Sequence, residues 1–334
     1  MKYKIGKRII KTGIAVSLSI GLAHALGFTT TFSGVVALIA MKETSKRTIR
    51  YGVTLFLGSL LSVIIGLILG VFLGKSVIAF GIGTILALSL IVRLQLADGI
   101  ILATIVVYHV LDAMPITGKQ FVSFSLKEIA VIGIGIVVSV LVNLIVPQKY
   151  DALLKENIEE FNTRFSTFFE RMAANVKNPE LRSIPTQDEY YECRKQIKVL
   201  LDQAEISKEN ALLSEEINIY TKYITMLKLY KKLITLLEEL TFQVGHLQST
   251  RIHSKSIAGA LQQLSKMQKN PSLNPIETFK EMSELLNQLN DHYANSPLPK
   301  TREEFVDRAH LYHIFIYVRE YADTLFLFYK NNLK

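Results

Sequence analysis

The sequence is poor in the residues on which catalytic and metal-binding proteins most often depend. Its 334 residues include no tryptophan and a single cysteine, Cys193. One cysteine excludes an internal disulfide and a cysteine-based metal cluster, so we expect this thiol to be a small buried side chain. The sequence contains no evident nucleophile–base set and no glycine-rich nucleotide loop that follows a strand. We therefore expect no cofactor, no metal ion and no enzymatic activity.

Acidic residues are also scarce, but only in the first part of the chain. Residues 1–150 hold 14 Lys and Arg against 4 Asp and Glu, whereas residues 151–334 hold 24 against 25. All the net positive charge therefore lies in the apolar part of the sequence. This distribution argues against nucleic-acid binding, which needs basic residues on a solvated face. Basic residues that flank apolar runs are instead typical of topology determinants in membrane proteins.

The apolar part is predicted to cross a membrane six times. A helix needs about 20 apolar residues to span a hydrocarbon core of about 30 Å. Five runs approach this length: residues 9–28, 51–73, 76–92, 96–111 and 126–146. A sixth run, 32–41, is short and must recruit residues 28–31. Basic residues, among them Lys2 and Lys4, precede the first run and also fill residues 42–50. Both stretches are expected in the cytoplasm, which requires two crossings between them.

This topology gives a six-span domain at residues 1–148 in the inner membrane of a bacterial cell, with both termini in the cytoplasm. An alternative for the first run is a secretory signal peptide with a cleavage site at Ala23-His24-Ala25. Residues 149–334 carry apolar residues at helical spacing and predict a soluble cytoplasmic helical bundle. Its helices are expected at residues 151–177, 186–207, 209–248, 252–269, 275–295 and 301–331. The predicted fold class is all-α.

Small residues recur at every fourth position in the predicted spans. Two such stripes are Gly58, Ser62, Gly66, Gly70 and Gly74 in the third span, and Gly13, Ser17, Gly21 and Ala25 in the first. Small residues let helix backbones approach closely where lipid supplies no hydrophobic force between helices. We expect these stripes to pack the bundle. Some of them could instead form a homo-oligomer interface or a sliding surface, and this alternative stays open.

Polar groups inside a bilayer are costly and are therefore candidate transport residues. Asp98, near Arg93 at the start of the fifth span, is the strongest candidate. Burial raises the proton affinity of a carboxylate, which suits a proton-coupled cycle; the alternative is an interfacial acid paired with Arg93. Further candidates for a substrate or proton pathway are His24, Thr30, Ser33, His109 and Asn143. Each of these has a structural alternative as an interfacial or packing residue.

One segment resembles a known family. Residues 32–70 read FSGVVALIAMKETSKRTIRYGVTLFLGSLLSVIIGLILG. The short span, the polar loop with Lys42, Thr44, Thr48 and Arg50, and the glycine-rich span that follows resemble the bacterial aromatic acid exporter family, which is related to fusaric acid resistance proteins. The segments MKYKIGKRIIKT and RLQLADGI resemble its Gram-positive branch, whose members carry a C-terminal helical domain. The resemblance implies export of aromatic or other hydrophobic carboxylic acids. It also implies a homodimer, because larger relatives hold two six-span halves in one chain.

These observations predict a gradient-driven, proton-coupled efflux transporter of aromatic or other amphipathic organic acids. Its expected partners are the lipid bilayer, a small organic anion and a second copy of the chain. The alternative is a membrane-anchored scaffold or sensor whose cytoplasmic helical domain binds a protein partner. A polar cavity in the membrane domain, lined by His24, Asp98 or Asn143, favours transport. An apolar groove on the helical domain favours the scaffold.

Overall fold

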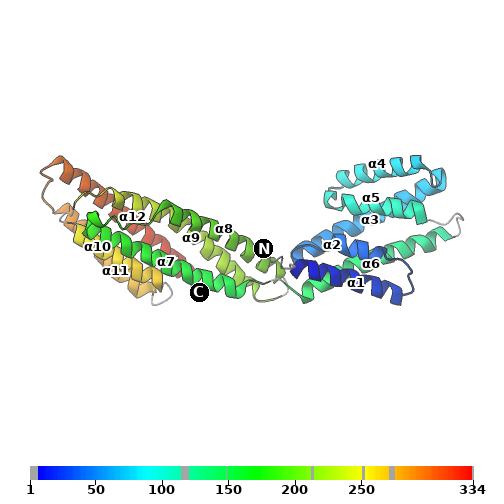
Figure 1. The fold of residues 1–334 in the computed structure, drawn as a ribbon, viewed down its shortest axis with the longest axis horizontal. Coiled ribbons are helices and arrows are strands. Elements are labelled where there is room, and N and C mark those ends of the chain that lie inside the picture. The colour runs from blue at the N-terminus through cyan, green and yellow to red at the C-terminus, as the bar shows by residue number, and fades with distance from the viewer. Residues whose placement is uncertain are drawn as a thin grey trace. The chain divides into compact units, whose positions relative to one another are not determined.

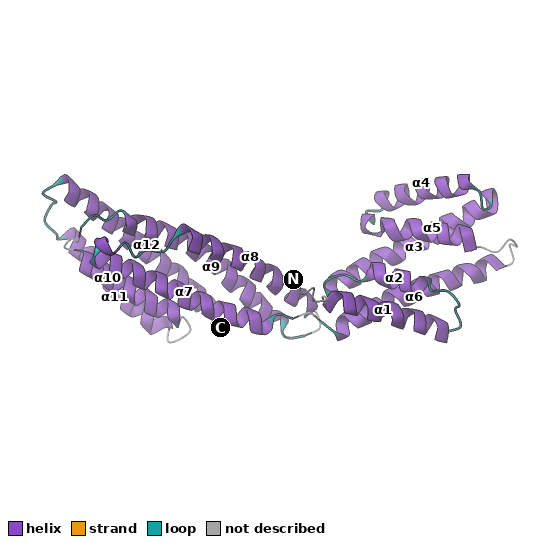
Figure 2. Ribbon diagram, viewed as in Figure 1, coloured by secondary structure: helices purple, strands orange, loops and turns teal. Residues whose placement is uncertain are grey.

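The fold is entirely helical in the part of the chain that the structure describes. The structure is a computed structural model that describes residues 7–113, 120–147, 149–211, 214–249, 253–270 and 275–332. Within these ranges the chain forms twelve α-helices and two short 3₁₀ helices, without a strand (Figure 2). The predicted all-α class is therefore confirmed. Lys2 and Lys4 of the predicted basic N-terminus lie outside the described residues.

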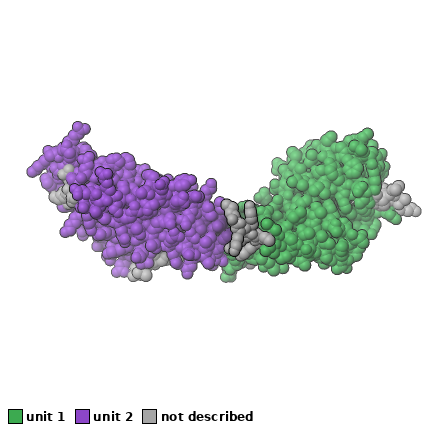
Figure 3. Space-filling view, in the orientation of Figure 1, with its two compact units in different colours: residues 1–149, 206–217 green, residues 150–205, 218–334 purple. Residues whose placement is uncertain are grey.

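The chain divides into two compact units. Unit 1 contains residues 1–149 and 206–217, and unit 2 contains residues 150–205 and 218–334 (Figure 3). The segment 206–217 thus belongs to unit 1, although the sequence places it in the predicted soluble domain.

Unit 1 contains six α-helices from the apolar part of the sequence. They are α1 (Lys7–Ala25), α2 (Phe32–Ala40), α3 (Ser45–Leu73), α4 (Val77–Arg93), α5 (Ile100–Ala113) and α6 (Phe121–Ile145), and the 3₁₀ helix η1 (Ala97–Gly99) precedes α5. α2 has nine residues, which correspond to about 14 Å at 1.5 Å per residue. α3 has 29 residues and is about 44 Å long. The short second run of the sequence is therefore a short helix.

Two helical segments are long and apolar enough to cross a membrane. In the described residues these are Ser45–Leu73 of α3 and Ser123–Ile145 of α6, and α4 (Val77–Arg93) is apolar but shorter. Large apolar side chains also lie on the outside of unit 1: Phe72, Val77 and Ile85 have exposed fractions of 79%, 88% and 66%. An extended apolar outer surface is typical of a membrane-facing or protein-facing region.

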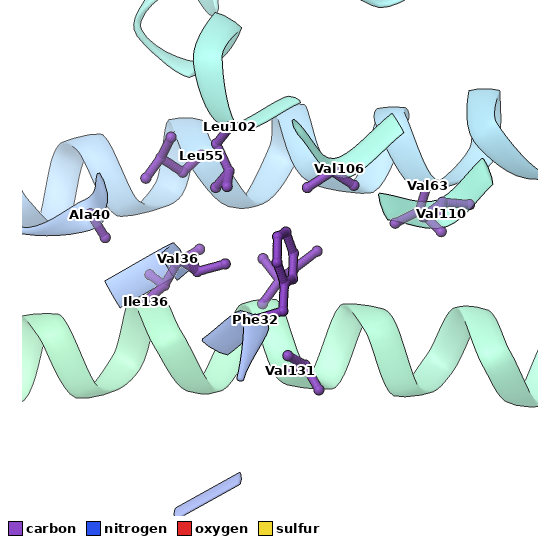
Figure 4. Close-up of a cluster of buried hydrophobic side chains, with 11 residues drawn as sticks. Phe32, Val36, Ala40, Leu55, Val63, Leu102, Val106, Val110, Val131 and Ile136 are labelled. Carbon is purple, nitrogen blue, oxygen red and sulfur yellow. The ribbon is translucent and has the colours of Figure 1, made fainter. Parts of the chain in front are cut away.

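The helices of unit 1 form two groups that meet along α3 and α6. α1 and α2 pack against each other and against α6, whereas α4 and α5 pack against each other and against α3 (Figure 1). The core between the groups contains Phe32, Val36, Leu55, Val106 and Ile136 (Figure 4). The six helices can be divided into two three-helix halves, α1–α3 and α4–α6. The first two helices of each half pack on the third helix of the other half: α1 and α2 on α6, and α4 and α5 on α3.

Glycines permit the closest of these helix contacts. A Cβ atom added to Gly135 of α6 would lie 2.5 Å from the backbone oxygen of Ser33 and 2.7 Å from Val36 Cβ. A Cβ atom added to Gly66 of α3 would lie 2.8 Å from Val110 Cγ1. Side chains larger than hydrogen at these two positions would force α2 away from α6 and α5 away from α3.

The two small-residue stripes face opposite surroundings. In α3 the stripe is buried from Gly58 to Gly70. Gly74 lies beyond it, exposed at the end of the helix with a φ of +58°, a conformation that glycine adopts without steric penalty. In α1, by contrast, Gly13 and Gly21 have no atom within 4 Å of an added Cβ. The α3 stripe therefore packs inside unit 1 and the α1 stripe faces outward.

The polar part of the sequence forms six further α-helices. They are α7 (Asp151–Lys177), α8 (Gln187–Asn210), α9 (Ile217–Gly245), α10 (Ser254–Lys269), α11 (Pro275–Ala294) and α12 (Arg302–Asn332), and the 3₁₀ helix η3 (Pro179–Leu181) lies between α7 and α8. The predicted break after residue 207 is wrong: α8 continues to Asn210, and α9 begins only at Ile217. Glu209 and Asn210, at the end of this helix, bind Thr44 and Ser45, as described below.

Unit 2 has a core of aromatic rings and a buried hydrogen-bond network. Tyr230 of α9 donates to Asn162 Oδ1 of α7 at 2.6 Å, and Gln268 of α10 donates to the same oxygen at 2.9 Å. Tyr321 of α12 donates to Gln268 Oε1 at 2.8 Å. Four helices are joined in this way. Cys193 is fully buried and free, as the sequence predicted.

Candidate functional site

Asn143 of α6 is the centre of a buried polar cluster in unit 1. Its side chain is fully buried, and its Oδ1 accepts a hydrogen bond from the ammonium group of Lys11 in α1. Its Nδ2 donates to Thr48 Oγ1 at 2.6 Å and to the backbone oxygen of Lys42 at 3.1 Å. The backbone N–H of Lys42 donates to Thr48 Oγ1 at 3.1 Å. One network thus joins α1, α3 and α6.

Lys11 carries a charge into the interior of this apolar unit. Its exposed fraction is 8%, and it lies on the buried face of α1 together with Ala15 and Ser19. Within the described residues no carboxylate forms an ion pair with it, and its hydrogen-bond partner is the neutral amide of Asn143. A buried cation is costly unless it is paired. The Lys11 ammonium is therefore a candidate binding group for an anion.

The segment before α3 also binds the end of α8. Glu209 Oε2 accepts a hydrogen bond from Thr44 Oγ1 at 2.9 Å. Asn210 Oδ1 accepts from the backbone N–H of Ser45 at 2.8 Å. The Ser45 hydroxyl donates to the backbone oxygen of Asn143 at 3.1 Å. The end of α8 is therefore linked through Ser45 to the cluster that holds Lys11.

A second polar site lies between α5 and α6. His109 Nε2 is 3.1 Å from Glu128 Oε2, and Glu128 is buried with an exposed fraction of 7%. The imidazole ring stacks on Phe32 of α2, with centroids 4.3 Å apart and an angle of 10° between the planes. The two atoms are within ion-pair distance, but neither has a hydrogen-bond partner among the described residues, so a reorientation of the ring or of the carboxylate is needed before they share a proton. The pair is therefore a candidate proton-carrying site.

Two predicted pathway residues, Asn143 and His109, belong to these polar sites. Two others bind backbone groups: the Ser33 hydroxyl donates to a backbone oxygen of α1 at 3.2 Å, and Thr30 Oγ1 accepts from the N–H of Phe32 at 3.1 Å. These hydroxyls thus fix the entry into α2 and its packing on α1.

The remaining predicted pathway residues lie on the surface of unit 1. Asp98 in η1, Arg93 at the end of α4 and His24 at the end of α1 are all exposed. Their part in a transport pathway stays a prediction. In the described residues no group of three or more His, Cys, Asp or Glu side chains is placed to hold a metal ion.

Lys11 and Glu128 were not among the candidates from the sequence. Glu128 is one of only 4 acidic residues in residues 1–150, and this rarity was a usable signal. Lys11 is one of the basic residues around the start of the first apolar run, a group whose pattern is that of topology determinants. Its spacing of four and eight residues from Ala15 and Ser19 puts it on one helix face with small residues. That spacing could have indicated burial.

The sequence matches known families over nearly its whole length. Residues 3–146 match the sequence family described as "Aromatic acid exporter family member 1". Residues 151–324 match the family described as "Putative aromatic acid exporter C-terminal domain". The chain belongs to the aromatic acid exporter family. The resemblance drawn from residues 32–70 is thereby confirmed.

This exporter-family member is similar to several Bacillus proteins. It is 24% identical over 323 residues to "Uncharacterized protein YqjA" of Bacillus subtilis strain 168, which covers 96% of this chain and 94% of YqjA. It is 28% identical over 159 residues to "UPF0421 protein YgaE" of the same strain, which covers 47% of this chain and 44% of YgaE. A UPF0421 protein of Bacillus cereus strain ATCC 14579 is 26% identical over 186 residues, 55% of this chain and 52% of that protein. The alignments with the two UPF0421 proteins thus span about half of their length.

Membership of an exporter family favours a transport protein over an enzyme. Together with the apolar helices α3 and α6, it also favours a membrane location. Unit 1 combines these helices with the two buried polar sites and is therefore the candidate transport unit.

Proposed function

We propose that the protein is a gradient-driven exporter of small aromatic or other amphipathic organic acids in the bacterial cell membrane. In this proposal α1–α6 cross the membrane, and both termini and the segment 42–50 are cytoplasmic. The transported carboxylate binds at Lys11. The observation that carries the proposal is the buried Lys11 ammonium, whose hydrogen-bond partner is a neutral amide.

An organic anion suits the surroundings of Lys11. A carboxylate would form a charge-assisted hydrogen bond with the ammonium, roughly twice as strong as a neutral one. Lys42 lies beside the same cluster, with its ammonium 3.6 Å from the centroid of the Tyr51 ring. Basic residues at the mouth of a low-dielectric site raise the local concentration of anions. The cytoplasmic end of unit 1 is thus suited to collecting acids that are ionised at neutral pH.

The His109–Glu128 pair supplies a place for the coupling proton. An anion that leaves a cell negative inside gains about 2.3 kcal/mol per 100 mV, and a proton that enters in exchange gains the same again. The membrane potential therefore drives the exchange twice, once through the anion that leaves and once through the proton that enters. His109 stacks on Phe32 of α2, and α2 packs on α1, the helix that carries Lys11. A change of protonation at His109 can act on the anion site through this packing.

The exchanged packing of the three-helix halves supports a transport mechanism. α1–α3 and α4–α6 each cross the membrane an odd number of times in the proposed topology, so the two halves have opposite orientations. Inverted halves with a binding site at their interface are common among secondary transporters. Phe32, His109 and Asn143 lie on α2, α5 and α6, which meet at this interface.

Retention of labelled benzoate by cells with and without the gene tests the proposal. Cells that carry the gene are expected to retain less benzoate. We expect Lys11→Met to lower the export rate at least about tenfold, because it removes the buried ammonium to which the anion binds. Glu128→Gln is expected to abolish the response of export to a protonophore. The matched control is Lys46→Met, because Lys46 is basic but exposed.

Equal retention in all of these strains, at equal amounts of protein in the membrane, would contradict the proposal. It would favour the alternative of a membrane-anchored scaffold or sensor. Loss of export in Lys46→Met as severe as in Lys11→Met would show that basic charge in general, rather than the buried ammonium, is needed.

We also propose that the protein is a homodimer that associates through the outward face of α1. Gly13 and Gly21 leave open space on this face, and Ser17 is exposed between them. Ser17→Cys in a Cys193→Ser background is expected to form disulfide-linked dimers in membranes. Val53→Cys on the exposed face of α3 is the control. Equal cross-linking at both positions, or none at Ser17→Cys, would contradict this interface.

A further inference from the structure

A carboxylate of the protein itself is bound at the start of α3. Glu209 Oε2 accepts a hydrogen bond from Thr44 Oγ1 at 2.9 Å and lies 2.8 Å from Arg47 Nε. Thr44 Oγ1 in turn accepts a hydrogen bond from the backbone N–H of Arg47 at 3.1 Å. Glu209 belongs to unit 1, like the two residues that hold it. A hydroxyl group and a guanidinium group thus converge on one carboxylate oxygen.

These two groups recognise a carboxylate without recognising the rest of a glutamate. Arginine forms charge-assisted contacts with carboxylates that are about twice as strong as neutral hydrogen bonds. The hydroxyl group of Thr44 adds a donor at a fully buried position. The carboxylate of another molecule would therefore bind to Thr44 and Arg47 by the same contacts.

Glu209 is held in a way that permits its replacement. The side chain of Arg47 is 51% exposed and that of Glu209 is 25% exposed. Ion pairs that are open to water contribute little to stability, so a carboxylate from solution can take the place of Glu209. Asn210 secures the end of α8 separately, because its Oδ1 accepts from the backbone N–H of Ser45 at 2.8 Å. Glu209 can therefore leave while the end of α8 stays bound.

A buried hydroxyl group connects this site to the Lys11 cluster. Thr48 lies one helical turn beyond Thr44 in α3, about 6 Å along the helix axis, and both side chains are fully buried. Thr48 Oγ1 accepts from Asn143 Nδ2 at 2.6 Å, and Asn143 Oδ1 accepts from the Lys11 ammonium. Arg47 is half exposed, whereas Lys11 has an exposed fraction of 8%. The carboxylate site therefore lies on the solvent side of the buried ammonium.

We infer that Thr44 and Arg47 form an entry site for the transported organic acid, and that Glu209 occupies this site when no acid is bound. The inference rests on the proposed export function and adds a self-inhibitory contact to it. An incoming carboxylate displaces Glu209, takes its contacts with Thr44 and Arg47, and then passes to Lys11. Because the acid and Glu209 compete for the same donors, the apparent affinity for the acid is lower than that of the free site.

A tryptophan reporter measures binding at the entry site without transport. The chain has no tryptophan, so Lys46→Trp, at an exposed position next to Arg47, gives a fluorescence signal from the start of α3. In the full-length, detergent-solubilised protein we expect a saturable change with benzoate. Benzamide, which lacks the charge, is expected to bind at least about tenfold more weakly. In a Lys11→Met background the benzoate response should persist, because the entry site does not include Lys11. If Lys46→Trp is silent, Lys208→Trp serves as the second reporter.

Two variants in the reporter background test the competition with Glu209. Glu209→Gln keeps the size of the side chain but removes its charge, so it is expected to tighten benzoate binding about tenfold. Arg47→Gln is expected to weaken benzoate binding about tenfold. The matched control is Glu43→Gln, because Glu43 also forms an ion pair with Arg47, at 3.8 Å, but from an exposed position. It should change the affinity by no more than about twofold.

The export assay gives a second readout for Glu209→Gln. We expect the benzoate concentration at half-maximal export to fall about tenfold, whereas the maximal rate should change by less than about twofold. A fall in the maximal rate alone would contradict a competing carboxylate at the entry site.

Three binding results would overturn the inference: no saturable benzoate response from either reporter, equal affinity for benzoate and benzamide, or equal tightening by Glu209→Gln and Glu43→Gln. Export of benzoate that Lys11→Met abolishes, without a reporter response, would overturn the entry site and leave the export proposal standing. A reporter response that Glu209→Gln tightens, in a protein that does not export benzoate, would leave the carboxylate site standing and overturn the export proposal.

Discussion

The two units of the molecule bury their side chains by different means. Unit 1 exposes large apolar side chains such as Phe72 and Val77 and packs its helices through glycines. Unit 2 packs rings in its interior: Phe165 lies 5.9 Å from Phe161 and 5.6 Å from Tyr230 between ring centroids. In water the burial of a ring removes 150–250 Å² of surface, about the largest contribution of any side chain. In lipid that gain is absent, and close backbone approach replaces it. This contrast agrees with the membrane location proposed for unit 1.

Removal of a core ring from unit 2 should have the largest effect. Phe165 is fully buried among three rings, so Phe165→Ala is expected to lower the free energy of unfolding of unit 2 by about 3–5 kcal/mol. The measurement is the urea midpoint of the tyrosine signal of unit 2. Phe242→Ala, at a ring with an exposed fraction of 56%, is the control and should cost much less. Similar losses for the two variants would contradict an aromatic core.

An added methyl group should disturb unit 1 at one glycine and not at another. Gly135→Ala places Cβ 2.5 Å from a backbone oxygen, which cannot move without shifting α2. We therefore expect the free energy of unfolding to fall by about 3 kcal/mol. Gly133→Ala, two residues earlier, has no atom within 4 Å and should be neutral or stabilising by about 0.5–1 kcal/mol. Thermal unfolding in detergent compares them. Equal stability of the two variants would show that α2 and α6 are not in close contact.

The contrast between the units was visible in the sequence, whereas the polar sites were only partly so. The charge distribution and the four-residue stripes predicted an apolar helical half with close packing, and the short run 32–41 predicted the short α2. The break between α8 and α9 was misplaced because Glu209 and Asn210 are held by Thr44 and Ser45. Contacts between residues more than 160 positions apart leave no periodic signal.

The candidate site could likewise be predicted from the sequence only in part. Asn143 and His109 were found because polar residues in apolar runs are conspicuous. Lys11 was missed because a lysine near the end of a span has the same sequence appearance whether it faces the cytoplasm or the interior. The direction of its side chain is decided by the packing of α1 on α6, which no local pattern encodes.

A buried histidine should make unit 2 sensitive to acid. The pKa of His253 is about 4, below its ordinary 6.5, so between these values the unfolded chain binds a proton that the folded chain does not. Stability therefore falls as the pH falls from about 6.5 to 4, by on the order of 3 kcal/mol, and the His253 contribution then levels off. His253→Gln should flatten the pH dependence of the urea midpoint. His313→Gln, at an exposed ring, should not, and an equal slope in wild type and His253→Gln would contradict the assignment.

Removal of the hydrogen bond between Asn210 and Ser45 should have the smallest effect. Asn210→Ala leaves the buried N–H of Ser45 without its acceptor, at a cost of about 1 kcal/mol. Hydrogen exchange of residues 43–48 is expected to become about fivefold faster. Asn210→Asp keeps the acceptor and should restore slow exchange. Unchanged exchange in Asn210→Ala would show that α8 does not secure this segment.

The account rests on unit 1 lying in the membrane with residues 42–50 inside the cell. Single cysteines at Lys46→Cys and Lys75→Cys, in a Cys193→Ser background, can be labelled with a membrane-impermeant maleimide. Both positions are exposed. In intact cells we expect Lys75→Cys to react at once and Lys46→Cys to react only after the membrane is permeabilised. Labelling of Lys46→Cys from outside intact cells would contradict the topology and the transport route built on it.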